Sequence, residues 1–153
     1  MIDKHLSEGP VYTVSGMPLQ FGPRLKALLD EPLLITLGTT RRDGSVQMNP
    51  VWYEHRDGQI WLNGGHNRGW FKHLERDPRI TLLVQDPKNA FRWAQIQGRL
   101  AGTSVDGADD HIEHLSQRYT GGPYRNPKID RLIIKIDPER VTGGENRVAW
   151  DVS

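Results

Sequence analysis

Residues 59–76 combine a glycine-rich turn with basic side chains. Gly64 and Gly65 follow a candidate strand, and Arg68 and Lys72 come just after them, at the start of a short helix. Glycine lets the backbone approach a ligand closely, and the first turn of a helix offers free N–H groups to an anion. The pattern predicts a site for a phosphorylated ligand. The alternative is a plain tight turn followed by solvated basic side chains.

An earlier strand, residues 46–55, carries a second group of candidate ligand contacts. Side chains of a strand alternate between its two faces. One face holds Gln47, Asn49, Val51 and Tyr53, and the other holds Met48, Pro50 and Trp52. If one face lines a cleft, backbone N–H and C=O groups near 49–51 could bond the polar edge of a ring-shaped ligand. The alternative is an ordinary polar outer face of a sheet.

The remaining reactive side chains form no recognisable catalytic motif. His111 and His114 have a spacing compatible with metal ligands on one helix, and Asp109, Asp110 and Glu113 are nearby. Polar helix faces commonly look like this, so we predict no metal site. Nucleophile elbows, P-loops and dinucleotide fingerprints are absent from the sequence. We therefore assign no catalytic side chain.

The composition excludes several classes of protein. A chain of 153 residues favours one domain over 1–153, with residues 1–22 as an extended, glycine- and proline-interrupted arm. A net charge of +1 gives no strong attraction to nucleic acid or to a membrane surface. The sequence has no cysteine, which excludes thiolate chemistry and fits a cytoplasmic protein. We find neither an apolar run near the roughly 20 residues that span a bilayer nor the apolar core of a signal peptide.

Turn residues divide the chain into short strands. Asp43-Gly44 and Asp57-Gly58 are two-residue hairpin signals. Apolar or alternating patterns mark the other strands. The expected strands are residues 33–40, 46–55, 59–63, 80–84, 92–102 and 130–137, and residues 140–150 could add one more, bent at Gly143-Gly144.

Three short helices complete the expected set of elements. Pro23 opens the first, residues 68–76 form the second, and the third follows Ala108 with apolar residues at helical spacing. Six or seven antiparallel strands with few helices favour a small closed or partly closed barrel. Side chains fill the interior of such a barrel, so a bulky ligand would have to bind outside it or at a dimer seam.

The order and spacing of these motifs resemble the split-barrel flavin-binding proteins, a family that includes pyridoxamine 5′-phosphate oxidase. The resemblance covers roughly residues 25–142. It is carried by Pro50-Val51-Trp52, the Asp57-Gly58 turn, Trp61-Leu62-Asn63, and the segments LERDPR, ITLLV and WAQIQGRL. The segments GADDHIEHLSQRYTG and RLIIKIDPERV resemble the actinobacterial branch whose oxidoreductases use the deazaflavin coenzyme F-420.

This resemblance implies a mainly β fold, the pyridoxamine phosphate oxidase-like FMN-binding split barrel. It implies a homodimer with two cofactor sites at the subunit interface, and F-420-dependent hydride transfer to a conjugated organic acceptor. An FMN-dependent oxidase or reductase is one alternative. A non-catalytic protein that binds a flavin, haem or a lipid-like ligand is another. In such enzymes the cofactor carries the hydride, so the protein needs no nucleophile.

The resemblance also implies which residues contact the ligands. The loop and helix would hold the phosphate, and the earlier strand would flank the ring. The implied cofactor contacts are Gln47, Asn49, Pro50, Val51, Trp52, Asn63, Gly64, Gly65, Arg68, Gly69, Trp70 and Lys72. Trp93 and Tyr119 would shape the substrate side, although the polar strip that Trp93 begins could instead be a dimer seam.

Three positions depart from the family pattern. Trp70 stands where a phosphate-binding lysine is common, and Lys72 could partly compensate for it. Gln47 and Trp52 replace an arginine and a lysine through which the oxidase itself holds the phosphate. These uncharged replacements favour the deazaflavin branch over the oxidase.

Overall fold

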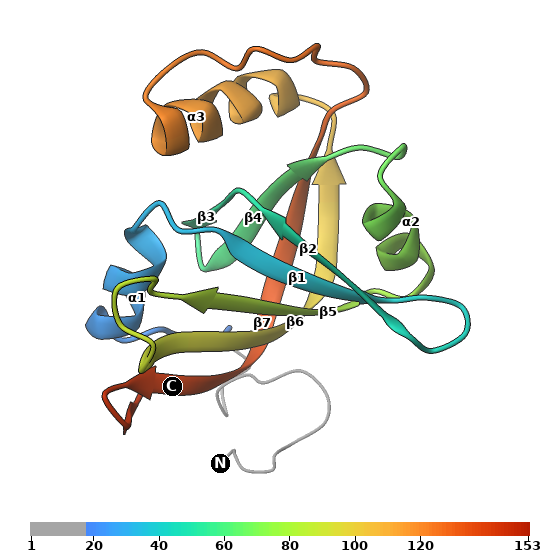
Figure 1. The fold of residues 1–153 in the computed structure, drawn as a ribbon. Helices are drawn as coiled ribbons and strands as arrows, with labels where there is room; N and C mark the ends of the chain where they lie inside the picture. The colour runs from blue at the N-terminus through green and yellow to red at the C-terminus, as the bar shows by residue number, and fades with distance from the viewer. Residues whose placement is uncertain (1–17) are drawn as a thin grey trace.

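The computed structural model describes residues 18–153, which form three helices and eight strands (Figure 1). Residues 1–17, most of the predicted arm, lie outside the described part of the chain. The helices are α1 (Pro23–Asp30), α2 (Gly69–Arg76) and α3 (Ala108–Thr120). The strands are β1 (Ile35–Thr40), β2 (Val46–Val51), β3 (Tyr53–Arg56), β4 (Gln59–Gly64), β5 (Arg79–Gln85), β6 (Arg92–Ser104), β7 (Leu132–Glu145) and β8 (Val148–Ala149).

The strands form one rolled antiparallel sheet. Their order is β2-β1-β5-β6-β7-β4-β3, and the two-residue β8 pairs with β7. β2 and β3 lie at opposite edges of this sheet, yet only Trp52 separates them along the chain. The two edges must therefore meet at Trp52, which rolls the sheet into a barrel that is split elsewhere. The predicted mainly β split barrel is confirmed.

Two predicted strand boundaries are wrong. Residues 46–55 are not one strand but two, because the chain changes from one sheet edge to the other at Trp52, whose ring stacks on Tyr119 of α3. The predicted strands 130–137 and 140–150 are not separated near residue 138, because β7 continues through Pro138 as far as Glu145, after which Val148–Ala149 form the short β8. The β6–β7 pairing shifts by one residue here, because Gln97 pairs with Arg140 and Gly98 with Pro138, and at such a bulge the missing N–H of the proline does not end the ladder.

The barrel interior is filled by apolar side chains, as expected for this size. Fully buried residues point inward from five strands, namely Leu37, Leu62, Leu82, Ile96 and Ile134. The predicted apolar faces of the helices cover this core: Leu25, Leu28 and Leu29 from α1, and Trp70, Phe71 and Leu74 from α2. A large ligand therefore has no room inside the barrel.

The guanidinium of Arg118, in α3, connects this helix to the end of α1 through hydrogen bonds. Arg118 donates hydrogen bonds to the backbone carbonyls of Leu29 (3.0 Å), Asp30 (2.9 Å), Glu31 (2.8 Å) and Tyr53 (3.1 Å). The last carbonyls of a helix lack partners within the helix. Arg118 supplies these partners from a distant part of the sequence and so fixes the end of α1 beside β3.

The turn from α2 into β5 is closed by Asp77. Its carboxylate accepts hydrogen bonds from Nε of Arg79 (3.0 Å) and from the second guanidinium nitrogen (2.7 Å). These bonds lower the pKa of Asp77 to about 2. Because folding lowers this pKa, the stability that it contributes is present above about pH 4 and is lost as the pH falls through about 2.

We expect Asp77→Asn to remove this part of the acid dependence. The free energy of unfolding of the variant should decline less steeply between pH 4 and pH 2 than that of the parent. Denaturant titrations at several pH values measure the slope, with Asp151→Asn, an exposed aspartate near the C-terminus, as the control. Identical slopes for Asp77→Asn and the parent would contradict the assignment.

Candidate functional site

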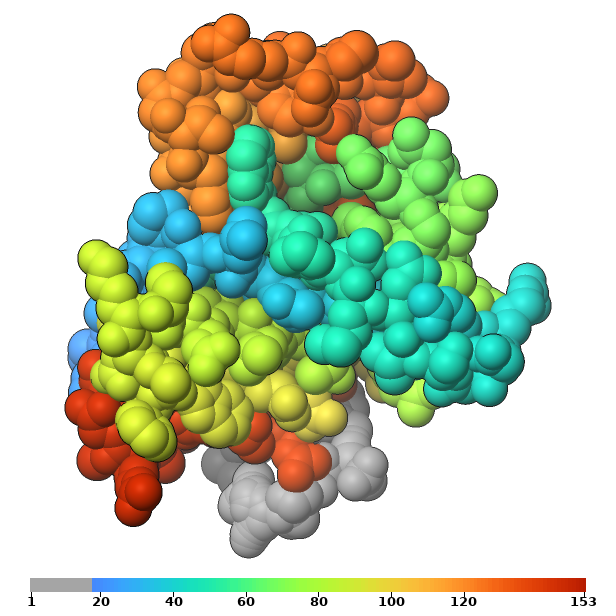
Figure 2. All heavy atoms as spheres, viewed as in Figure 1, coloured from blue at the N-terminus to red at the C-terminus, as the bar shows by residue number. Residues whose placement is uncertain are grey.

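The glycine loop after β4 borders a cavity of about 260 Å³. The loop contributes Gly64, Asn67 and Arg68, and the segment between α3 and β7 contributes Tyr124, Asn126, Pro127, Ile129 and Arg131. In the space-filling view a hollow opens between the orange segment that joins α3 to β7 and the green loop before α2 (Figure 2). Two predicted cofactor contacts, Gly64 and Arg68, therefore line one cavity.

The two loop glycines allow close approach to other parts of the chain. A Cβ on Gly64 would lie 3.0 Å from the ring of Trp70, and one on Gly65 would lie 2.6 Å from the backbone oxygen of Asp130. Neither glycine has a positive φ angle. The turn itself does not require glycine, so these residues are explained by the tight packing that forms the cavity wall.

Arg131 is a cavity residue that sequence reasoning missed. Its guanidinium donates to Oδ1 of Asn63 (3.3 Å) and to the hydroxyl of Tyr124, and it lies over the Tyr124 ring. Its Nε–H is buried and has no hydrogen-bond partner among the described residues. Together with Arg68, it gives the cavity a cationic donor set of the kind that binds phosphate or carboxylate.

Five other residues of the predicted phosphate site do not line the cavity, namely Gly65, Gly69, Asn63, Trp70 and Lys72. Asn63 is behind the wall, where its Nδ2 donates to the Ala108 carbonyl (2.9 Å). Trp70 is 5% exposed and packs in the hydrophobic core. Lys72 is exposed on α2 and does not line this cavity. Arg68 is therefore the cationic side chain that α2 and the loop before it contribute to the cavity.

The structure brings the predicted ring-flanking strand into contact with α2. Oε1 of Gln47 lies 2.9 Å from Nε2 of His73, and Nε2 of Gln47 donates to Oδ1 of Asn49 (3.0 Å). A Cβ on Gly69, the first residue of α2, would lie 3.7 Å from Nε2 of Gln47. Along the same strand Pro50 is exposed and Val51 is half-buried. His73 is a further polar group here that the sequence did not single out.

The two predicted substrate contacts, Trp93 and Tyr119, are far apart. The ring of Tyr119 stacks on Trp52 at 5.3 Å, and its hydroxyl donates to the Leu33 carbonyl (2.6 Å). Trp93 lies at the start of β6, beside β8, where its carbonyl accepts the indole N–H of Trp150 (2.9 Å). These places are at opposite ends of the fold (Figure 1), so within one chain the two residues do not share a site.

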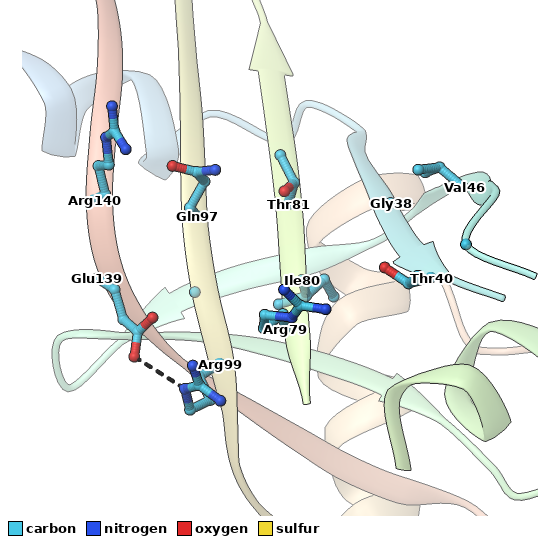
Figure 3. A pocket seen from close by; sticks show the side chains of 12 residues that line it. Gly38, Thr40, Val46, Arg79, Ile80, Thr81, Gln97, Arg99, Glu139 and Arg140 are labelled. Carbon is cyan, nitrogen blue, oxygen red and sulfur yellow. Dashed lines mark hydrogen bonds and ion pairs between the residues drawn. The ribbon is translucent and has the colours of Figure 1, made fainter. Parts of the chain in front are cut away.

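A second cavity, of about 550 Å³, is lined by residues of the strands β1, β2, β5, β6 and β7 (Figure 3). Arg79, Arg99 and Arg140 enter it from the neighbouring strands β5, β6 and β7. Arg79 is bound by Asp77, and Nε of Arg99 lies 3.2 Å from Glu139. None of its lining residues belongs to the predicted site, and carboxylates already neutralise two of its arginines.

The rolled sheet and its strand order define a split-barrel protein. The chain belongs to the pyridoxamine 5′-phosphate oxidase family, whose model matches residues 21–143. None of the curated proteins compared with this sequence matches it.

Several solved structures share the fold. An F420 reductase is 27% identical, with a TM-score of 0.71 over 76% of this chain and 94% of that one. A conserved hypothetical protein of Mycobacterium tuberculosis is 20% identical, with a TM-score of 0.64 over 90% and 88% of the two chains. A putative pyridoxamine 5′-phosphate oxidase of Listeria innocua is 16% identical, with a TM-score of 0.62 over 77% and 93%. The last two likenesses concern the fold alone.

Residues 18–153 show neither a metal-binding cluster nor a membrane-spanning helix. They contain no group of three or more histidine, aspartate or glutamate side chains that could hold a metal ion. None of their helices is long and apolar enough to cross a membrane.

Proposed function

We propose that the protein is an oxidoreductase that binds the anionic part of a flavin-type cofactor, coenzyme F-420 in preference to FMN, in the cavity at the glycine loop. The observation that carries this proposal is the convergence of Arg68 and Arg131 on one cavity in a chain of the pyridoxamine 5′-phosphate oxidase family. The similarity to an F420 reductase, at 27% identity, supports the choice of cofactor.

The size of the cavity suggests which part of the cofactor it takes. At about 260 Å³ it is smaller than the roughly 300–1,000 Å³ of pockets that enclose a whole small molecule. It suits a phosphate and its neighbouring atoms, whereas the tricyclic ring would lie outside it. When bound, the cofactor supplies the hydride for transfer to a conjugated organic acceptor, and the protein residues bind and orient it.

A second copy of the chain would enclose the ring. Large apolar side chains are exposed on and beside β1 and β2, namely Leu34, Val46 and Met48. Exposed apolar side chains that gather on one face are typical of interaction surfaces. We propose a homodimer with this face at its seam, working in the reducing cytosol that a cysteine-free chain fits. Sedimentation that gives only the 17.4 kDa species at micromolar concentration would refute the dimer.

We expect Arg68→Ala to weaken cofactor binding about tenfold to thirtyfold. The variant loses a charge-assisted hydrogen bond worth roughly 1.5–2 kcal/mol. Fluorescence titration with F-420 measures the effect, and FMN and haem are titrated in parallel. Lys72→Ala is the matched control, because Lys72 is a basic residue of α2, only four residues after Arg68, and does not line the cavity. Equal affinities for Arg68→Ala and the parent would remove Arg68 from the site. A clear preference for FMN or haem would replace the F-420 proposal by one of the alternatives.

A further inference from the structure

A chain of buried polar side chains runs from β3 to the cavity. It begins at Glu54 and His111, which are 9% and 4% exposed, with 2.8 Å between Oε2 and Nε2. His111 Nδ1 lies 3.2 Å from Nδ2 of Asn63, and Oδ1 of Asn63 accepts a hydrogen bond from Arg131. Arg131 then reaches Tyr124 in the cavity wall. The proposed cofactor chemistry uses neither the glutamate nor the histidine.

The chemistry of these groups determines where the protons are. A guanidinium can only donate, so the amide oxygen of Asn63 faces Arg131. The Asn63 NH₂ group therefore faces both the Ala108 carbonyl and Nδ1 of His111. Nδ1 must then accept, and the single proton of a neutral imidazole is on Nε2, facing the Glu54 carboxylate.

Several charged groups surround this histidine. Glu54 and His111 lie within ion-pair distance of each other, but their contact is not a well-aligned hydrogen bond. His114 lies 3.4 Å from the same carboxylate and Arg56 lies 4.0 Å from it. Burial raises the pKa of Glu54, but His111, His114 and Arg56 outweigh burial and lower it, so the group is a carboxylate at neutral pH. The ring of Trp61 packs edge-on against the ring of His111, and the ammonium group of Lys135 lies over the face of the Trp61 ring.

We propose that Glu54, His111 and Asn63 are positioning residues that hold the Arg131 guanidinium in the anion cavity, and that a second proton on His111 releases it. A proton on Nδ1 would place two donors face to face across 3.2 Å. Asn63 can relieve this repulsion only by turning its amide. Its NH₂ group then faces the guanidinium, and the bonds to Ala108 and Arg131 are both lost. The proposal rests on the proposed function only in taking the cavity to bind an anion.

The test follows the side chains by NMR between pH 5 and pH 8, without any ligand. In the parent, the Nε–H resonance of Arg131 should shift with the same midpoint as the His111 ring. In His111→Gln the Arg131 resonance should not move, because the amide of glutamine can accept from Asn63 and donate to Glu54 but does not titrate. His114→Gln, an exposed neighbour on α3, should leave the coupling intact. If the Arg131 resonance of the parent does not shift with the midpoint of the His111 ring, the proposal is wrong. This comparison needs only the parent protein, so it remains decisive if a variant does not fold.

Binding gives the second measurement. Sulfate is the probe, because its charge is constant over this pH range. Its affinity for the parent should fall about tenfold from pH 8 to pH 5.5, and for His111→Gln it should stay at the high-pH value. An equal fall in both proteins would refute the role of His111. No sulfate or F-420 binding at any pH would refute the proposed function, and the resonance coupling would then decide the positioning of Arg131 by itself.

Discussion

Arg118→Ala is expected to lower the free energy of unfolding by about 3 to 4 kcal/mol. The side chain donates to four backbone carbonyls, three of them at the end of α1. A hydrogen bond from a charged donor contributes roughly 1.5–3 kcal/mol, and a buried acceptor left without a partner costs about 1–3 kcal/mol. Tyr53 still donates its hydroxyl to the Leu29 carbonyl, and water can reach Asp30, so the loss is smaller than the sum of four bonds.

Urea titration of Arg118→Ala and of the parent measures this loss. Arg125→Ala is the matched control, because that arginine is exposed in the loop after α3. Arg118→Lys should restore only a small part of the stability, since an ammonium cannot span four acceptors in the geometry of a planar guanidinium. A loss below about 1 kcal/mol for Arg118→Ala would show that α3 does not depend on this contact.

Gly143→Ala is expected to destabilise the fold by about 3 kcal/mol. Gly143 has a φ angle of +97°, where an L side chain costs roughly 1–2 kcal/mol. The added Cβ would also lie 2.4 Å from the carbonyl oxygen of Trp93 and 2.8 Å from its ring, and overpacking of this kind costs about 1–3 kcal/mol. Both atoms belong to β6, the partner strand, so the two strands would have to separate.

Gly102→Ala provides the control for this substitution. Gly102 is also a glycine of the long central strands, but its φ is not positive and no atom lies within 4 Å of an added Cβ. Its replacement by alanine should change the unfolding free energy by less than about 0.5 kcal/mol. Equal midpoints of thermal unfolding for Gly143→Ala and Gly102→Ala would contradict the close approach of Trp93 to Gly143.

The parts of the fold that short-range patterns determine could be predicted. Asp43-Gly44 and Asp57-Gly58 are turn residues between β1 and β2 and between β3 and β4, as their chemistry indicates. Leu25, Leu28 and Leu29 give α1 its buried face because helical spacing alone places them together. Such features depend on neighbours a few residues away.

Features that depend on distant contacts could not be predicted. Nothing in residues 46–55 marks Trp52 as the point where the chain leaves one sheet edge for the other, because the contact that Trp52 makes there is with the distant Tyr119 in α3. Arg131 lies at the start of an apolar strand, and its place beside Arg68 follows from the pairing of β7 with β4. The distance between Trp93 and Tyr119 in the fold also depends on contacts between distant parts of the chain. Their spacing in the sequence therefore could not show whether they share a site.

The central place of β7 has a consequence for biosynthesis. Among the described strands β7 is the last long one to be synthesised, yet it pairs with β6 on one side and with β4 on the other. Until it emerges, the nascent chain holds β4 with an unpaired edge, and such edges are prone to aggregation. The barrel therefore has to close late, when nearly all of its strands have been synthesised, and chains arrested before β7 should depend on chaperones to remain in solution.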